Sequence, residues 1–479
     1  MGRANYCNKV LDHFDNPSND KFINIKNKMK IKKDKKETFK NILILGYGKT
    51  GKSIAEFFKN NKLNIYFWDD NSEVFDKISN NFFKYNNQSL SIFQRIFVSP
   101  GISKSHKIVK NAYKNKIKIS SDIELFLSKL KALNKNNLLL AVTGTNGKST
   151  IALMIARALK VKPLANFGNL VLENVPEEDQ SIVLELSSFQ LEYIDYIKPK
   201  VSIISNIKED HISYHGSLKS YINSKIKICH HQKQKDYTIL NYDDLNIRKA
   251  FLRKDLSKAK VIWVSSQKKI NDGLSYLGDI LYDYYFTKKE YQISKNNFLT
   301  HHHNKLNFVI SYAALKCFHY ESEKAIKSLK TFKGLPHRVE CIGKVNNIYF
   351  YNDSKATNVS ATSSALQSFN KVFLIAGGAS KGGSFNSLVK HAGKICEAYL
   401  IGETAKELKK VLEKFCKSII CNDLEEAVKK SYNKSIISKT NYPILLSPAC
   451  ASFDQYENYK SRGNHFKKLF NKILNGQLQ

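Results

Sequence analysis

The stretch LLLAVTGTNGKST, residues 138–150, determines how the rest of the chain is interpreted. Its apolar start predicts a short buried strand, a glycine-bounded turn follows at 144–147, and IALMIARAL then has a helical pattern. Small residues let backbone N–H groups surround an anion, and a helix N-terminus adds partial positive charge. The ammonium group of Lys148 can reach β- and γ-phosphates, and the hydroxyl of Ser149 can bind Mg²⁺. The stretch therefore predicts a nucleotide-binding loop, although two residues rather than the usual four separate its glycines.

Length and composition bound the class of protein. The chain has 479 residues, which corresponds to about three domains of ~150 residues each. With 42% hydrophobic and 11% aromatic residues it does not have the composition of a disordered chain. Its eight cysteines are scattered without a C-x-x-C pair, which disfavours a zinc site or a disulfide framework. No apolar run approaches the ~18 residues of a membrane span, and the start lacks a signal peptide, so we expect a cytoplasmic protein without membrane insertion.

The strong positive charge has two interpretations. The chain carries 77 lysines and arginines against 42 aspartates and glutamates, a net charge of +35. Such a balance is typical of a protein with a polyanionic partner, but it also arises when lysine replaces other residues throughout a sequence. Here the charge is spread along the chain apart from residues 26–40, and no basic stretch is interleaved with aromatic residues as in nucleic-acid-binding modules. We therefore favour compositional drift and expect no nucleic-acid partner.

The first regular region follows a basic extension, residues 1–39, which we predict to be disordered. From residue 40 an apolar strand leads into Gly46, Gly48 and Gly51, and a second strand ends at Asp69 about 20 residues later. This is the dinucleotide fingerprint with its acidic partner. Alone it would indicate NAD or FAD, but the same geometry serves the pyrophosphate of a UDP-sugar. Residues 40–130 are therefore predicted to form a Rossmann-like domain with a phosphate site.

Polar side chains follow two strands of the middle region, residues 131–333. Glu185 ends one apolar run, and the next is followed by Asn206, Asp210 and His211. Carboxylates at the carboxyl ends of buried strands, beside a phosphate loop, suit Mg²⁺ ligation and phosphoryl transfer. Lys225 falls in a helical stretch whose pattern alone indicates a solvent-exposed side chain.

Three contiguous histidines, 301–303, begin another helix of the middle region. Because adjacent residues point in different directions, capping and packing are favoured over a metal site. Asn304 and Asn307 share one face of that helix. In residues 334–479 strands again alternate with helices. The predicted fold class is thus α/β in three domains: a Rossmann-like N-terminal domain, a central P-loop ATPase-like domain with a mostly parallel sheet, and a Rossmann-like C-terminal domain.

The motifs together carry a family resemblance. In order, the chain contains GTNGKST, LELSSFQLE, NIKEDH, HHHNKLN, GLPHRVE, NDSKATN, GGASKGG and LLSPACASFDQY. Residues 40–479 resemble the Mur ligases of peptidoglycan synthesis, which use the same shortened loop. The stretches LSSFQLE, PHR, NDSKATN and SPACASFDQ indicate the branch of the family that adds D-glutamate.

The resemblance implies an ATP and metal site. Catalytic roles would fall to Lys148, Glu185, His211 and Lys225. Two Mg²⁺ ions would be held by Ser149, Glu185, His211 and Lys225, the last as a carbamylated lysine. ATP would contact Gly144, Thr145, Asn146, Gly147, Lys148, Ser149, Thr150, Asn304, Asn307, Arg338 and Asp353.

The resemblance also implies two substrate sites. UDP-N-acetylmuramoyl-L-alanine would lie along Gly48, Thr50, Asp69, Ser99 and Asn169, and D-glutamate would lie among Lys355, Thr357, Lys381, Ser452 and Tyr459. Four places depart from the family pattern: Ser380 stands where Asp is usual, Lys49 and Tyr459 replace commoner residues, and FGNLV around Asn169 is less glycine-rich.

The implied reaction joins D-glutamate to the sugar-nucleotide carboxylate through an acyl phosphate, with ADP and phosphate released, in a monomeric enzyme. Two alternatives stay open. A sister ligase would keep the ATP site and accept another amino acid. A nucleotide-binding protein without catalysis is disfavoured by the intact Lys148, Glu185, His211 and Lys225.

Overall fold

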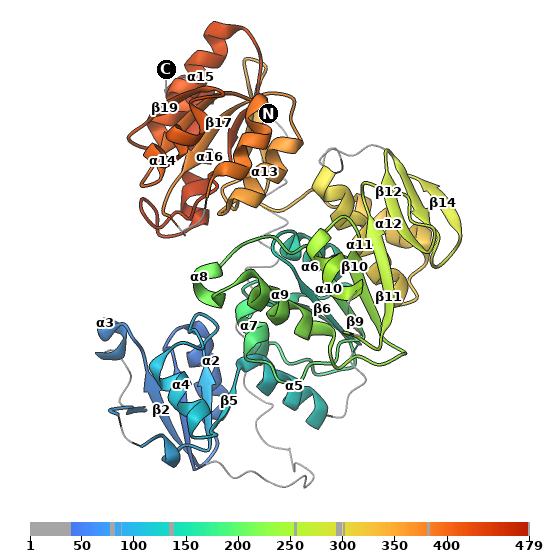
Figure 1. Ribbon diagram of the computed structural model, residues 1–479, viewed down its shortest axis with the longest axis vertical. Helices are drawn as coiled ribbons and strands as arrows, with labels where there is room; N and C mark the ends of the chain where they lie inside the picture. The colour runs from blue at the N-terminus through green and yellow to red at the C-terminus, as the bar shows by residue number, and fades with distance from the viewer. Residues whose placement is uncertain are drawn as a thin grey trace. The chain divides into compact units, whose positions relative to one another are not determined.

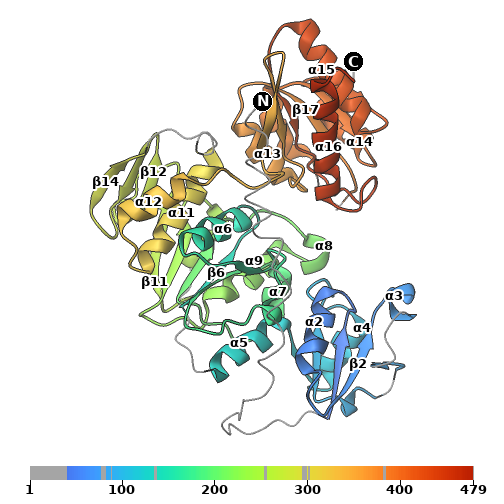
Figure 2. The ribbon, with the colours of Figure 1, turned by 180° about the vertical axis from the view of Figure 1, so that it is seen from behind.

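The computed structural model describes residues 40–76, 82–87, 89–133, 138–252, 256–293, 299, 302–380 and 384–477, without the side chains of Ser213 and His302. The predicted extension 1–39 and Lys381 lie outside these described residues. Three α/β regions follow one another along the chain, coloured blue, green to yellow, and orange to red in Figure 1 and in the reverse view of Figure 2.

The N-terminal region is a five-stranded parallel sheet in the order β3-β2-β1-β4-β5. Its strands are β1 (Asn41–Leu45), β2 (Asn64–Trp68), β3 (Phe83–Lys84), β4 (Arg95–Val98) and β5 (Lys118–Ser120). Its helices are α2 (Lys49–Phe58), α3 (Ser72–Asp76), α4 (Lys107–Lys114) and the 3₁₀ turn η1 (Leu90–Ile92). The run NILIL suits the middle strand β1, since a parallel strand covered on both faces is apolar along its whole length.

The central region is a nine-stranded sheet in the order β14-β13-β12-β11-β10-β9-β6-β8-β7. Strands β6 to β12 are parallel to one another, and the β12–β13 and β13–β14 pairs are antiparallel. The strands are β6 (Leu138–Thr143), β7 (Pro163–Ala165), β8 (Ser181–Glu185), β9 (Val201–Ile204), β10 (Tyr237–Asn241), β11 (Lys260–Ser265), β12 (Gly273–Leu277), β13 (Ile280–Asp283) and β14 (Lys289–Gln292).

Helices accompany both faces of the central sheet. They are α5 (Asp122–Ala132), α6 (Lys148–Ala158), α7 (Ser188–Glu192), α8 (Ile212–His215), α9 (Leu218–Ile226), α10 (Leu245–Leu252), α11 (His302–Cys317), α12 (Ser322–Lys330), and the 3₁₀ turns η2 (Val171–Glu173) and η3 (Lys227–Cys229). Two apolar cores result. One gathers α6, α11 and α12, and the other buries Ile123, Phe126 and Leu130 of α5.

The C-terminal region is a six-stranded sheet in the order β15-β16-β20-β17-β18-β19, in which only the β15–β16 pair is antiparallel. Its strands are β15 (Glu340–Val345), β16 (Ile348–Asn352), β17 (Val372–Gly377), β18 (Ile395–Ile401), β19 (Lys417–Ile420) and β20 (Ile444–Leu446). Its helices are α13 (Val359–Gln367), α14 (Ala405–Leu412), α15 (Leu424–Ser438), α16 (Tyr459–Leu474) and the 3₁₀ segment η5 (Asn386–Lys394).

These three mostly parallel sheets confirm the predicted fold class. In the first two sheets the chain adds strands first on one side of β1 or β6 and then on the other, so that each of these strands lies at a switch point. Ligands of open α/β sheets bind at the carboxyl ends of the strands at such points. Both glycine loops follow these two strands. The boundaries at 130 and 333 stay predictions. Within the described ranges no helix has the length and apolar character needed to span a bilayer.

Candidate active site

The loop between β6 and α6 requires glycine at both of its ends. Gly144 and Gly147 have φ angles of 152° and 85°, a region that side-chain-bearing residues rarely adopt. A Cβ atom at position 144 would lie 2.0 Å from the hydroxyl of Ser205, and one at 147 would lie 2.7 Å from Oδ1 of Asn307. The loop therefore passes closely against the end of β9 and against α11.

The residues after β9 hold this loop in place. The backbone N–H groups of Thr145 and Asn146 donate to the carbonyl and Oδ1 of Asn206, both at 2.8 Å. In return, Ser205 Oγ and Asn206 Nδ2 donate to the carbonyl of Asn146 at 2.8 and 2.9 Å. The loop is thus fixed before any ligand arrives. The backbone N–H groups in the first turn of α6 have no carbonyl of their own helix to donate to, so they can donate to an anion.

Two lysine amines meet at this loop. Lys148 Nζ donates to the carbonyls of Gly144 and Thr145 at 2.8 and 2.9 Å, and Lys225 Nζ donates to the same Gly144 carbonyl at 2.8 Å. Lys225 is 1% exposed, and its amine lies 4.7 Å from the ring centre of Tyr221. The pattern-based expectation of a solvent-exposed Lys225 was wrong, because α9 packs this face inward.

Desolvation lowers the pKa of both amines. Desolvation lowers the pKa of Lys148, opposed by the nearby carboxylate of Glu185. The pKa of Lys225 falls well below its usual range because of burial and then of the neighbouring Lys148 charge, while Asp210 and Glu185 oppose the shift. The neutral form of the Lys225 amine is therefore favoured more than in an exposed lysine.

Glu185 ends β8 as a buried carboxylate that is only half satisfied. It is 1% exposed, and Oε1 accepts a hydrogen bond from Asn166 Nδ2 at 2.8 Å. Among the described residues its Oε2 has no hydrogen-bond partner. A buried carboxylate oxygen left in this way is costly unless a cation or donor completes it, so Glu185 fits a metal ligand.

His211 and Asp210 lie at the start of α8. His211 precedes the helix with a φ of 54°, and its ring packs against Phe189 with centroids 4.7 Å apart. Asp210 Oδ1 accepts from the His211 backbone N–H at 3.0 Å, and its Oδ2 accepts from Asn358 Nδ2 at 2.9 Å. In the described part of the chain no three His, Cys, Asp or Glu side chains cluster closely enough to hold a metal by themselves. A metal here would need the other predicted ligands, Ser149 and a modified Lys225.

The residues predicted around the nucleotide fall into two groups. On α11, Asn304 and Asn307 are both 5% exposed, and Asn307 Nδ2 donates to Asn304 Oδ1 at 3.3 Å. From the C-terminal region, Arg338 Nη2 donates to Ser149 Oγ at 2.8 Å. Asp353 accepts from Ser447 Oγ at 2.7 Å, and burial raises its pKa to about 7. Thr150 is buried in the first turn of α6.

The first glycine loop brings most of the predicted UDP-sugar residues together. Gly48 precedes α2, whose first turn contains Thr50. Asp69 Oδ2 accepts from the backbone N–H of Tyr47 at 2.8 Å, and Ser99 Oγ donates to the carbonyl of Gly46 at 3.4 Å. Asn169 instead belongs to the central region, where its side chain donates to the carbonyl of Pro163 at 2.8 Å.

Of the residues predicted for D-glutamate that the structure describes, Lys355 contacts the first residue of α16. Lys355 Nζ lies 3.9 Å from the ring centre of Tyr459, and Thr357 donates its backbone N–H to the Lys355 carbonyl at 2.8 Å. Ser452 is 2% exposed and follows the loop after β20. The backbone N–H of Ser380, which stands where Asp was expected, reaches Glu403 Oε2 at 3.4 Å.

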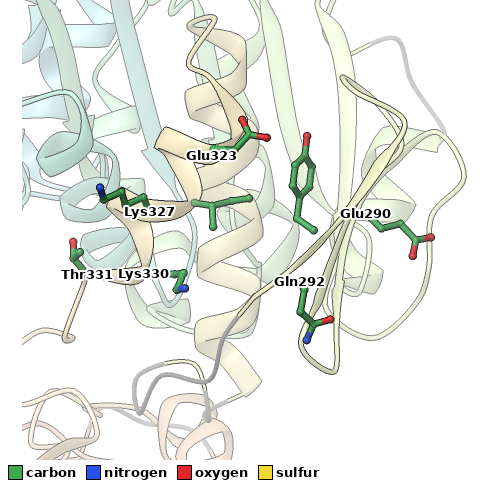
Figure 3. A pocket seen from close by; sticks show the side chains of 8 residues that line it. Glu290, Gln292, Glu323, Lys327, Lys330 and Thr331 are labelled. Carbon is green, nitrogen blue, oxygen red and sulfur yellow. The ribbon is translucent and has the colours of Figure 1, made fainter.

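A separate groove lies at the far edge of the central sheet, between β14 and α12 (Figure 3). It has a volume of about 590 Å³ and is lined by Glu290, Tyr291, Gln292, Glu323, Ile326, Lys327, Lys330 and Thr331. None of the predicted site residues lines it, and five strands separate β14 from β6 in the sheet order.

Comparison with known proteins decides the family. Sequence models of three domains match in order: the MurD-like N-terminal domain of Mur ligases over residues 40–121, the Mur ligase middle domain over 142–315, and the Mur ligase glutamate ligase domain over 337–450. The chain belongs to the Mur ligase family. A UDP-N-acetylmuramoylalanine–D-glutamate ligase of Rickettsia bellii is 34% identical over 90% of this chain and 98% of its own length. The ligase of that name from Rickettsia prowazekii is 35% identical over 89% and 96%.

Solved structures of Mur ligases share the fold. MurF of Thermotoga maritima, solved in complex with ADP, superposes with a TM-score of 0.58 at 16% identity, covering 92% of this chain and 97% of its own. MurC from the same organism gives 0.53 at 16% identity, with 91% and 100% covered. A pseudomurein peptide ligase of Methanothermus fervidus gives 0.54 at 17% identity, also with 91% and 100% covered.

Three residues of this Mur ligase site were assigned no role from the sequence. Asn166 binds Glu185, Asn358 binds Asp210, and Arg462, at 1% exposure, donates to the carbonyls of Ser354, Cys450 and Ala451 beside the predicted D-glutamate residues. Asn166 is a single asparagine in a loop that no spacing distinguishes, and Asn358 ends the stretch NDSKATN without a predicted role of its own. Arg462 sits on the inward face of α16, where an arginine among apolar positions was the one available signal.

Proposed function

We propose that this chain joins D-glutamate to UDP-N-acetylmuramoyl-L-alanine in an ATP-dependent reaction of peptidoglycan synthesis. The observation that carries the proposal is the convergence of two lysine amines, one of them fully buried, and a half-satisfied Glu185 carboxylate on one phosphate loop. The choice of substrates rests on the relatives, whose printed name is UDP-N-acetylmuramoylalanine–D-glutamate ligase along nearly the full length of both chains.

The loop provides the positive charge that the first chemical step needs. The substrate carboxylate and the γ-phosphate are both anionic, so they approach only where positive charge is already fixed in place. Lys148 and the first-turn N–H groups of α6 would bind the β- and γ-phosphates, while Asn304, Asn307, Arg338 and Asp353 would contact the rest of ATP. A carboxylate oxygen then attacks the γ-phosphorus and ADP leaves, which gives an acyl phosphate.

Ser149, Glu185, His211 and a carbamylated Lys225 would hold two Mg²⁺ ions. The unpartnered Oε2 of Glu185 is the feature of this chain that fits such a role. Bound Mg²⁺ offsets the negative charge of the phosphates and of the attacking carboxylate.

The surroundings of Lys225 support the proposal that it is carbamylated. A neutral amine attacks CO₂, a C–N bond forms, and one proton is released, so that the neutral amine becomes a carbamate anion. The lowered pKa of Lys225 supplies the neutral amine. With ¹³C-bicarbonate we expect a carbamate carbon signal in the native protein that is absent from Lys225→Ala; a native protein without the signal would contradict this assignment.

The second step takes place beside the C-terminal region. Lys355, Thr357, Lys381, Ser452 and Tyr459 would bind D-glutamate so that its amine faces the acyl carbon. The amine attacks, phosphate leaves, and the peptide bond forms. Closure of the site would exclude water that otherwise hydrolyses the acyl phosphate.

Phosphate release tests the proposal. Native protein is incubated with ATP and UDP-N-acetylmuramoyl-L-alanine, with D-glutamate, L-glutamate, L-alanine or a diamino acid added in turn. Lys148→Ala is the inactive variant, and Lys249→Ala, which changes an exposed lysine on α10, is its matched control. We expect release that requires D-glutamate, survives in Lys249→Ala and is lost in Lys148→Ala.

Each other result favours one alternative. Preference for a different amino acid would make the chain a sister ligase. A folded protein that binds ATP but releases no phosphate with any of them would be a nucleotide-binding protein without catalysis. The cytoplasmic location and the monomeric state stay predictions.

A further inference from the structure

The turn 99–102, which carries Ser99, is held from outside the N-terminal sheet by two tyrosines. Tyr193 Oη donates to the carbonyl of Ile102 at 2.8 Å, and Tyr214 Oη donates to the same carbonyl at 2.9 Å. Resting on the proposed function, we infer that Tyr193 and Tyr214 are positioning residues that fix the sugar-nucleotide turn relative to the ATP site.

Both ends of the turn are tied down. On the inner side, Ser99 donates its backbone N–H to the carbonyl of Leu45 at 3.0 Å and its hydroxyl to that of Gly46 at 3.4 Å. Ile102 N–H closes the turn on the carbonyl of Ser99 at 3.0 Å. A carbonyl oxygen has two lone pairs, so the two hydroxyls use the full acceptor capacity of Ile102. The turn therefore cannot shift without breaking bonds on both sides.

The two tyrosines come from the segments that carry the ATP-site residues. Glu185 ends β8 and leads into α7, whose C-terminal cap is Tyr193. His211 caps the N-terminus of α8, which contains Tyr214. Phe189 of α7 joins the two segments, with its ring centre 4.7 Å from that of His211 and 4.4 Å from that of Tyr214. Each of these two segments is thus joined to the Ser99 turn by a direct hydrogen bond.

Burial makes the connection stiff. Tyr193 is 3% exposed and packs into the apolar core of the N-terminal sheet, although it belongs to the central part of the chain. The preceding residue, Glu192, forms an ion pair with Lys104, which follows the turn, with 3.6 Å between Oε1 and Nζ. Burial raises the pKa of both tyrosine hydroxyls, so both remain protonated donors throughout the physiological range.

Such positioning affects rate and substrate affinity together. The carboxylate of a sugar nucleotide bound along Ser99 must reach the γ-phosphorus held at the loop 144–147. A misplacement of about 1 Å costs up to roughly a hundredfold in rate. ATP, bound by the central loop itself, does not depend on the turn.

The test uses Tyr193→Phe, Tyr214→Phe and the double variant, which remove hydroxyls and keep the rings. Tyr320→Phe is the matched control, because its hydroxyl also donates to a backbone carbonyl, that of Ala158 at 2.8 Å, away from the turn. The measurements are kcat, the KM for the sugar nucleotide, the Kd for ATP and the thermal midpoint.

We expect the double variant to lose between about tenfold and a hundredfold in kcat/KM for the sugar nucleotide, with the Kd for ATP unchanged. Each single variant should lose much less, since the other hydroxyl still satisfies Ile102, and the losses should not add. Tyr320→Phe should behave as native.

Two results would overturn the inference: a double variant with native kinetics, or one that loses ATP affinity as much as sugar-nucleotide affinity. If the double variant does not fold, the two single variants decide: the inference requires a lower kcat/KM for the sugar nucleotide with an unchanged Kd for ATP. Native protein without D-glutamate-dependent phosphate release would instead reject the proposed function, so the two failures are distinguishable.

Discussion

The two glycine loops of the molecule begin alike and are built differently. Each follows the strand at a switch point of a parallel sheet and leads into a helix, β1 into α2 and β6 into α6. The first loop is held by two backbone N–H groups, one donated to the carbonyl of Trp68 and one to Asp69, and by one hydroxyl from Ser99. Its lysines, Lys49 and Lys52, are exposed.

The central loop is instead held by the two residues that follow β9, and the lysines beside it are less exposed than those of the first loop. Asn206 and Ser205 bind it with four hydrogen bonds at 2.8–2.9 Å. Lys148 and Lys225 both donate to one of its carbonyls. The difference indicates a division of work: the first loop binds a phosphate-containing ligand, while the second is prepared for chemistry on one. Changes at the first loop should alter affinity, and changes at the second should alter rate.

The strongest test of this division exchanges a carboxylate beside each loop for its amide. Glu185→Gln removes the charge beside the central loop, and we expect kcat to fall on the order of a hundredfold to a thousandfold. Asp69→Asn keeps an acceptor for the Tyr47 N–H, so we expect a few-fold rise in the KM for the sugar nucleotide and little change in kcat. Steady-state phosphate release measures both. Equal losses of kcat would contradict the division.

Alanine at one glycine of each loop probes how they are built. A Cβ at Gly144 would meet the Ser205 hydroxyl at 2.0 Å, and one at Gly51 would meet the backbone carbonyl of Gly46 at 2.0 Å. Each change should destabilise by about 1–3 kcal/mol and lower the thermal midpoint. Adding Ser205→Ala should recover part of the loss in Gly144→Ala, where φ stays unfavourable, and none in Gly51→Ala. Equal recovery in both would show that the obstacle at 144 is not the hydroxyl.

A pH titration extends the contrast to Asp353, which interacts electrostatically with Arg338, the residue that donates to Ser149 beside the central loop. Burial raises the pKa of Asp353 from 3.8 to about 7, so the folded state binds a proton that the unfolded state releases. The resulting stabilisation is fully present below pH 4 and is lost as the pH rises towards 7. Asp353→Asn should therefore flatten the fall of the thermal midpoint between pH 4 and 7. An unchanged slope would assign that fall to other groups.

The smallest expected effect is at the exposed lysine of the first loop. Lys49→Ala should raise the KM for the sugar nucleotide by no more than about threefold, because an exposed charge is screened by solvent and salt. The difference from native should vanish at high ionic strength. A large loss of kcat in Lys49→Ala would place chemistry at the first loop and break the comparison.

The features of the molecule that the sequence predicted are local in nature. The strand 41–45, both glycine loops and the carboxylate at the end of β8 are found where apolar runs and spacing indicated them, because strand, loop and helix signals lie within about 20 residues. The three-sheet α/β class followed from the same alternation.

What the sequence did not predict depends on packing between distant segments. The burial of Lys225 is decided by which face of α9 turns inward, and its pattern alone suggested the opposite. Asn166 meets Glu185 across two neighbouring strands, and three carbonyls that accept from Arg462 lie 11, 12 and 108 residues away along the chain.

Transfer of oxygen from the sugar nucleotide to phosphate tests the central claim most directly. UDP-N-acetylmuramoyl-L-alanine labelled with ¹⁸O in its carboxylate is converted with ATP and D-glutamate, and the released phosphate is analysed by mass spectrometry. Attack of the carboxylate on the γ-phosphorus, followed by cleavage of the acyl C–O bond, predicts one ¹⁸O atom in each phosphate. Unlabelled phosphate released together with the peptide product would contradict the account.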